Sequence, residues 1–168
     1  PQRVRSLVSI MSTTGDPSVG QPHEAAMAAL LQSPPATLED AMRQGVEAWR
    51  LLGSPGFAFD EERVRSQAAA AYGRAFHPAG VGRQMVAILS SGDRTAALRA
   101  LDCPSLVVHG EADILVDPSG GQATAAAIPG AELVMVSGMG HDLPRELFEE
   151  MADRVSDHAH PQDRRLGG

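Results

Sequence analysis

The sequence is organised around the stretch from Cys103 to Pro144, which reads CPSLVVHGEADILVDPSGGQATAAAIPGAELVMVSGMGHDLP. It contains two apolar, β-branched runs, Ser105–His109 and Glu132–Val136, and a glycine-containing turn follows each of them. A nearly continuous Val/Leu run is typical of a strand that is buried on both faces, as in a parallel sheet covered by helices. The stretch therefore predicts an α/β fold.

Two side chains with catalytic chemistry follow these predicted strands. Asp113 lies just beyond the first run, and His141 lies just beyond the second. In open α/β sheets the functional groups gather outside the carboxyl ends of the strands, so these two side chains are expected to meet. An aspartate beside a histidine fixes the tautomer of the imidazole and prepares it to act as a base. We predict that Asp113 and His141 form such a pair, through Nδ1 of the histidine.

The same stretch resembles the C-terminal part of an α/β-hydrolase. The resemblance rests on P-S-L-V-V-H-G-E-A-D, on the strand that follows and on the loop G-M-G-H-D-L-P, and it covers roughly residues 3–158. In that family the catalytic triad runs along the chain as nucleophile, acid and histidine. The resemblance implies that Asp113 is the catalytic acid and His141 the general base of a serine hydrolase acting on carboxylic esters.

The chain before this stretch contains one predicted strand, Val4–Met11, and then only helical patterns. The resemblance implies that residues 1–20 and 99–158 form part of a hydrolase core, with about three parallel strands. It also implies that the helices of residues 21–98 form a cap inserted into that core. The polar residues 159–168 are expected to form a flexible tail.

Four apolar residues of the predicted helices are candidates for substrate contact. They are core residues by default, but any that face the strand ends would line an apolar pocket for an acyl or alcohol group. We therefore expect a small, apolar, ester-like substrate. The four candidates are Met27, Trp49, Tyr72 and Met85.

A nucleophile cannot be found in the sequence. The family places its serine on a G-x-S-x-G turn, and the nearest match, D-P-S-G-G around Ser119, has Asp117 in place of the first glycine. The resemblance implies that the nucleophile elbow precedes Pro1. Relatives with an aspartate nucleophile cleave epoxides or carbon–halogen bonds, and others cleave C–C bonds, so the reaction stays open. The second hypothesis is a hydrolase-like protein that binds a ligand or a protein without catalysis.

Composition argues against several classes of partner. The net charge is −7 and the basic residues, all arginines, form no stripe, which argues against nucleic acid. No apolar run approaches the roughly 20 residues that cross a bilayer, so no membrane partner is expected. Histidine spacings lack a third ligand, so no metal or other cofactor is expected. The single cysteine, Cys103, excludes an internal disulfide and slightly favours the cytoplasm.

The predicted strand Val4–Met11 would lie inside the sheet of a complete hydrolase. Here it would present an open edge, and open edges invite pairing with another chain. We therefore expect it to pair with a missing N-terminal half or with a second chain. On this basis the isolated chain should neither hydrolyse esters nor persist as a stable monomer.

Overall fold

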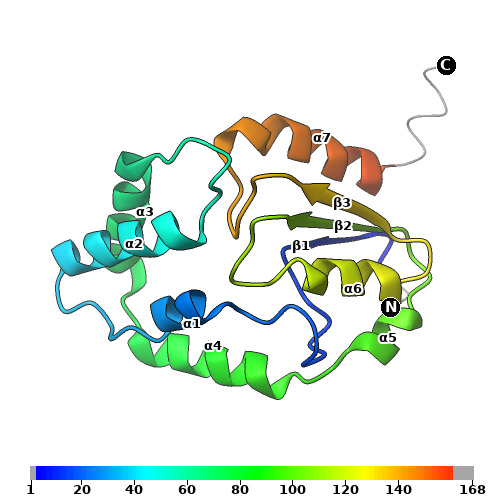
Figure 1. Cartoon of the computed structure of the whole chain (residues 1–168), viewed down its shortest axis with the longest axis horizontal. Helices are drawn as coiled ribbons and strands as arrows, with labels where there is room; N and C mark the ends of the chain where they lie inside the picture. The colour runs from blue at the N-terminus through cyan, green and yellow to red at the C-terminus, as the bar shows by residue number, and fades with distance from the viewer. Residues whose placement is uncertain (1–2, 161–168) are drawn as a thin grey trace.

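The structure, a computed structural model, describes residues 3–160 and contains a parallel sheet with helices on both faces (Figure 1). In chain order, the elements are β1 (Leu7–Ile10), α1 (Glu24–Leu30), α2 (Leu38–Leu52), α3 (Glu61–Ala75), α4 (Pro78–Ser90), α5 (Thr95–Arg99), β2 (Ser105–Gly110), α6 (Ser119–Ala127), β3 (Glu132–Val136), a 3-10 turn η1 (Arg145–Leu147) and α7 (Phe148–Ala159).

The sheet confirms the parallel arrangement predicted from the Val/Leu runs. Its order is β1-β2-β3, with Leu7 opposite Ser105 and Leu106 opposite Glu132. All six residues of β2 are buried, because β2 has a strand on each side and helices above and below. An unbroken apolar run is the pattern that such a position requires.

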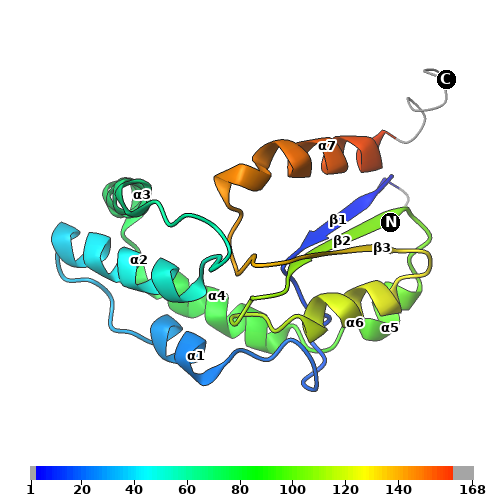
Figure 2. The same ribbon diagram turned by 45° about the horizontal axis from the view of Figure 1, so that its top comes forward.

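The two faces of β2 contact different helices, α7 on one face and α6 on the other (Figures 1 and 2). Leu106 and Val108 pack with Met151 of α7 in the main hydrophobic cluster. Because side chains alternate along a strand, Val107 and His109 point the other way, towards α6. The close approach is visible at Gly121 of α6, where a Cβ atom would lie 2.4 Å from His109 Nδ1.

Helices α1 to α4 lie between β1 and β2 in the sequence, and we call residues 21–98 the helical insertion. Figures 1 and 2 both place α2 and α3 beyond the carboxyl ends of the strands. Two helices of the insertion begin at side-chain N-caps: the Asp40 N–H donates to Thr37 Oγ1 at 3.1 Å, and the Arg63 N–H donates to Asp60 Oδ1 at 3.0 Å. The insertion is therefore helical, as expected, and it stands over the end of the sheet that carries the predicted site.

Several element bounds differ from the predictions. The first strand covers Leu7–Ile10 and not Val4–Met11, since its ladder with β2 begins at Ser105, directly after Pro104, which has no N–H to donate. Two helices also begin earlier than their local sequence suggests. Helix α4 begins at Pro78 within H-P-A-G, a pattern typical of a turn, because proline fits the first turn of a helix. Helix α6 begins at Ser119, ahead of the Ala-rich run that follows Gln122.

The C-terminal helix, α7, ends at Ala159. Residues 161–168 of the predicted flexible tail lie outside the described residues. Within residues 3–160, no helix is both long enough and apolar enough to span a bilayer. The division into core, cap and tail stays a prediction.

Candidate active site

Asp113 lies in the turn directly after β2, and its side chain is buried. One carboxylate oxygen, Oδ1, accepts hydrogen bonds from the N–H groups of Leu115 and Val116, both at 2.9 Å. These bonds fold the turn around the carboxylate and leave the second oxygen, Oδ2, available to another partner. The arrangement stabilises a buried charge that would otherwise be costly.

That second oxygen faces His141. The Nδ1 atom of His141 lies 2.8 Å from Asp113 Oδ2, so the predicted contact between the two side chains is present. An ionised carboxylate only accepts hydrogen bonds, so Nδ1 carries the proton and Nε2 carries the lone pair. The His141 side chain keeps 25% of its surface exposed, whereas the Asp113 side chain is fully buried. The pair therefore has a partly exposed imidazole in front of a buried carboxylate.

The backbone also joins the two loops that carry this pair. The Ala112 N–H donates to Met139 O at 2.9 Å, and the Glu111 N–H donates to Val136 O at 3.0 Å. Because β2 and β3 are adjacent and parallel, their ends lie at the same edge of the sheet, and short loops suffice to bring the side chains together. The distance between acid and histidine is thus fixed by the sheet and by loop-to-loop hydrogen bonds.

A second histidine stands behind the acid. His109, the fifth residue of β2, is fully buried, and its Nε2–H donates to Val116 O at 2.8 Å. The same Nε2 atom lies 3.5 Å from Asp113 Oδ2. Its other nitrogen, Nδ1, has no hydrogen-bond partner among the described residues. Through these contacts His109 supports the Asp113 turn from within the sheet.

The other two carboxylates near the turn do not join the pair. Asp117 accepts hydrogen bonds from the hydroxyl and the N–H of Ser119, and these bonds hold the pKa of the Asp117 carboxyl below its usual value. Ser119 in turn accepts from the Gly20 N–H at 3.0 Å and makes no hydrogen bond to His141. Glu111 is exposed. Among the described residues, the Asp113–His141 pair therefore has no serine partner.

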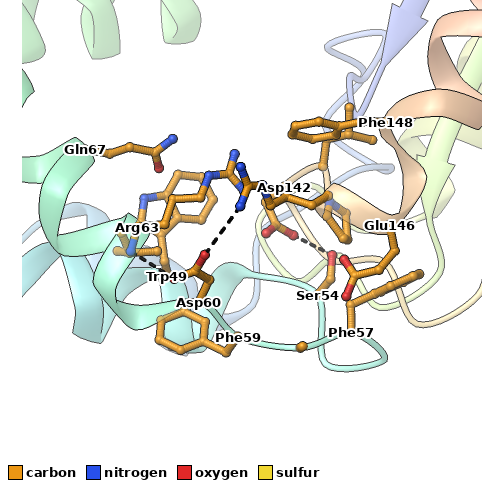
Figure 3. Close-up of a pocket in the computed structure, with 15 residues that line it drawn as sticks. Trp49, Ser54, Phe57, Phe59, Asp60, Arg63, Gln67, Asp142, Glu146 and Phe148 are labelled. Carbon is orange, nitrogen blue, oxygen red and sulfur yellow. Dashed lines mark hydrogen bonds and ion pairs between the residues drawn. The ribbon is translucent and has the colours of Figure 1, made fainter.

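A cavity of about 590 Å³ lies between the helical insertion and the segment after His141 (Figure 3). Aromatic rings from both sides line it, and the Arg63 guanidinium stands over the Phe148 ring at 5.4 Å from its centroid. Asp142 lines the cavity, whereas the neighbouring His141 does not. The aromatic lining consists of Trp49, Phe57, Phe59 and Phe148.

Only one of the four predicted substrate contacts lines this cavity. Trp49, near the end of α2, does so, whereas Met27, Tyr72 and Met85 are absent from its walls. The ring of Tyr72 instead packs on Phe76, with centroids 4.7 Å apart. Helical spacing placed these residues on apolar faces, but it could not say which neighbour each face meets.

No group of three His, Cys, Asp or Glu side chains in residues 3–160 is arranged to hold a metal ion. What the structure brings together is a buried carboxylate and a partly exposed imidazole in hydrogen-bond contact.

No family model matches the chain. It is 32% identical over 133 residues to a rhodomycin D methylesterase, DnrP, of Streptomyces peucetius; the match covers 79% of this chain and 44% of that protein. The chain thus spans less than half the length of this relative.

Solved structures with the same fold include two hydrolases. The esterase RhEst1 from Rhodococcus sp. ECU1013 superposes with a TM-score of 0.62 at 23% identity, covering 93% of this chain and 56% of the esterase. The 2-hydroxy-6-oxo-6-phenylhexa-2,4-dienoate hydrolase from Rhodococcus sp. strain RHA1 superposes with a TM-score of 0.65 at 21% identity, covering 94% and 56%. In fold, this chain is therefore an α/β-hydrolase, and it corresponds to the C-terminal part of that fold.

Proposed function

We propose that this chain supplies the acid and the base of a serine hydrolase that cleaves carboxylic esters. The observation that carries the proposal is the 2.8 Å contact between His141 Nδ1 and Asp113 Oδ2 at the carboxyl edge of the sheet. A buried, fully hydrogen-bonded aspartate behind a partly exposed histidine is the arrangement that a general base requires. A relative named a methylesterase supports an ester as the substrate class.

The reaction would proceed through an acyl-enzyme. A serine from outside this chain attacks the ester carbonyl carbon while its hydroxyl proton passes to His141 Nε2. The tetrahedral intermediate then expels the alcohol, which takes that proton from the imidazolium. Water repeats both steps on the acyl group and releases the acid. Asp113 stays ionised throughout and stabilises the imidazolium through the Nδ1 proton.

The nature of the absent nucleophile distinguishes this proposal from its alternatives. One solved neighbour is named a hydrolase of 2-hydroxy-6-oxo-6-phenylhexa-2,4-dienoate, so an ester is not the only substrate class to test. An aspartate nucleophile would lead to epoxide or haloalkane chemistry instead. Substrate contact at Trp49 is proposed from its place in the cavity wall. The cytoplasmic location stays a prediction.

The test begins with the coding sequence upstream of Pro1. A longer polypeptide that contains G-x-S-x-G should hydrolyse p-nitrophenyl esters, and Asp113→Asn should lower kcat by about 10⁴-fold. His141→Ala should remove turnover to a similar extent, whereas the exposed His77→Ala should not change it. Alone, the 168-residue chain should give no turnover and no labelling by a fluorophosphonate. Turnover of this chain alone that is lost in His141→Ala would contradict the absence of a nucleophile.

We further propose that the open edge of β1 is paired by another strand, either from the remainder of a longer polypeptide or from a second chain. Among the described residues, β1 pairs with β2 alone. The Leu7 N–H donates to Pro104 O, just before β2, and the Met11 N–H donates to Val108 O, so by alternation the Ile10 N–H points to the open edge. Ile10→Pro should therefore reduce association measured by light scattering while keeping the β1–β2 ladder. A wild-type chain that stays monomeric would contradict pairing with a second copy of this chain.

A further inference from the structure

The segment that carries His141 is held by the end of helix α2 as well as by Asp113. The His141 N–H donates to Leu52 O at 2.7 Å, and the Gly140 N–H donates to Ser54 Oγ at 2.9 Å. The Ser54 hydroxyl in turn donates to Asp142 Oδ1, as Figure 3 shows. Three consecutive residues around the histidine are therefore fixed to the helical insertion, more than 80 residues away in the sequence.

Ser54 contributes to this contact in two directions at once. Its oxygen accepts a hydrogen bond from the residue before His141, and its proton goes to the residue after His141. A hydroxyl can do both, whereas an aliphatic side chain can do neither and a carboxylate can only accept. The side chain therefore acts as a bridge across the backbone of the histidine.

The backbones at this point lie closer than ordinary side chains allow. A Cβ atom on Gly140 would lie 2.2 Å from Gly53 O and 2.7 Å from Leu52 O, both of which are backbone atoms. Glycine at position 140 thus permits the approach, and Ser54 and Leu52 hold it.

We propose that Ser54 is a positioning residue for His141, acting from the helical insertion on the base of the reaction. The proposal rests on the function proposed above. Asp113 fixes the orientation of the ring through Nδ1, and the bridge at Ser54 fixes the backbone from which the ring projects. Both are needed to keep Nε2 at a defined point, since a displacement of about 1 Å in an active site costs on the order of 10²-fold in rate.

If Ser54 only stabilised helix α2, any other change that weakens α2 should affect His141 equally. Thr37 provides the control for this alternative. Thr37 caps the other end of the same helix through an exposed hydroxyl, so Thr37→Ala weakens α2 without touching the histidine segment. Ser54→Ala removes the bridge, and Ser54→Thr keeps the hydroxyl. Asp142→Ala removes only the acceptor of the Ser54 proton and serves as a second variant if Ser54→Ala is insoluble.

The readout is the imidazole of His141 in the 168-residue chain, followed by ¹⁵N NMR. Ser54→Ala should speed exchange of the Nδ1 proton with water and introduce the second tautomer, because a ring that is held less firmly leaves its hydrogen bond to Asp113 more often. Asp142→Ala should act in the same direction to a smaller extent, and Ser54→Thr should restore the parent signal. An unchanged His141 signal in both Ser54→Ala and Asp142→Ala would overturn the proposal. So would an equal change in Thr37→Ala.

This measurement does not depend on ester hydrolysis, so it separates the two proposals. In the longer polypeptide, Ser54→Ala should lower kcat by about 10- to 100-fold with little change in KM, and Ser54→Thr should recover most of it. Absence of esterase activity from the parent polypeptide would refute the proposed function and leave the NMR result to decide on Ser54. A loss confined to KM would contradict a positioning role.

Discussion

The carboxyl edge of the sheet is buried, whereas helices α3 and α4 of the insertion are open to solvent. Every residue of β2 is buried, and so is Asp113 in the turn that follows it. Helices α3 and α4 contain no buried residue at all, and α4 exposes four large apolar side chains. The four are Val81, Val86, Ile88 and Leu89.

Glycine residues show what this difference means. Gly140, in the histidine segment, has backbone oxygens within 2.2 to 2.7 Å of the place a Cβ would take, whereas Gly73 in α3 and Gly82 in α4 have nothing within 4 Å. At the sheet edge, close packing leaves no room for a side chain, so glycine is required. In α3 and α4 a glycine only raises the conformational entropy of the unfolded chain, which lowers stability. The site is therefore closely packed, and we expect the outer helices of the insertion to tolerate substitution.

The largest effect should follow from opening the core beneath the site. Leu106 in β2 is buried in the main hydrophobic cluster, so Leu106→Ala should lower the free energy of unfolding by about 2–5 kcal/mol. The measurement is urea unfolding by circular dichroism at a fixed protein concentration. Ile88→Ala on α4, where the side chain is 68% exposed, is the control and should stay within about 0.5 kcal/mol of the parent. Equal losses would show that α4 is covered in solution.

A smaller but more local effect is expected at Gly140. A methyl group there collides with the backbone oxygens of Gly53 and Leu52, and neither can move without shifting the end of α2. Gly140→Ala should cost about 1–3 kcal/mol and should disturb the His141 ring signal. Gly73→Ala adds the same methyl group in open space and should leave that signal in place. A Gly140→Ala variant as stable as the parent would mean that the contact between α2 and the histidine segment is loose.

The sequence was sufficient for the acid–histidine pair because that pair follows from local patterns. Two buried strands, each followed by a turn, place Asp113 and His141 at one edge of a parallel sheet, and the structure has them there. Helix caps were equally local, since Thr37 and Asp60 stand at the start of apolar periodic runs. These features depend on a few neighbouring residues, so their spacing alone predicts them.

Contacts between distant segments could not be predicted in this way. In the sequence, Ser54 is part of G-S-P-G, a pattern that predicts only a turn at the end of a helix. It does not predict the hydrogen bonds of Ser54 to residues 140 and 142. Likewise, Trp49 and Tyr72 both lie on apolar helical faces, but only Trp49 reaches the cavity. Which partner a helical face meets depends on how the helices pack, and that information is spread over the whole chain.

The smallest effect should be a gain of stability in the outer helices. Gly82 lies inside α4, where a Cβ meets no atom within 4 Å, so Gly82→Ala adds helix propensity without a collision. We expect the free energy of unfolding to rise by about 0.5–1 kcal/mol, seen as a higher urea midpoint with an unchanged slope. The His141 signal should stay as in the parent chain, in contrast to Gly140→Ala. A loss of stability instead would show that another segment packs on α4 at this point, and it would end the contrast between a closely packed site and an open outer helix.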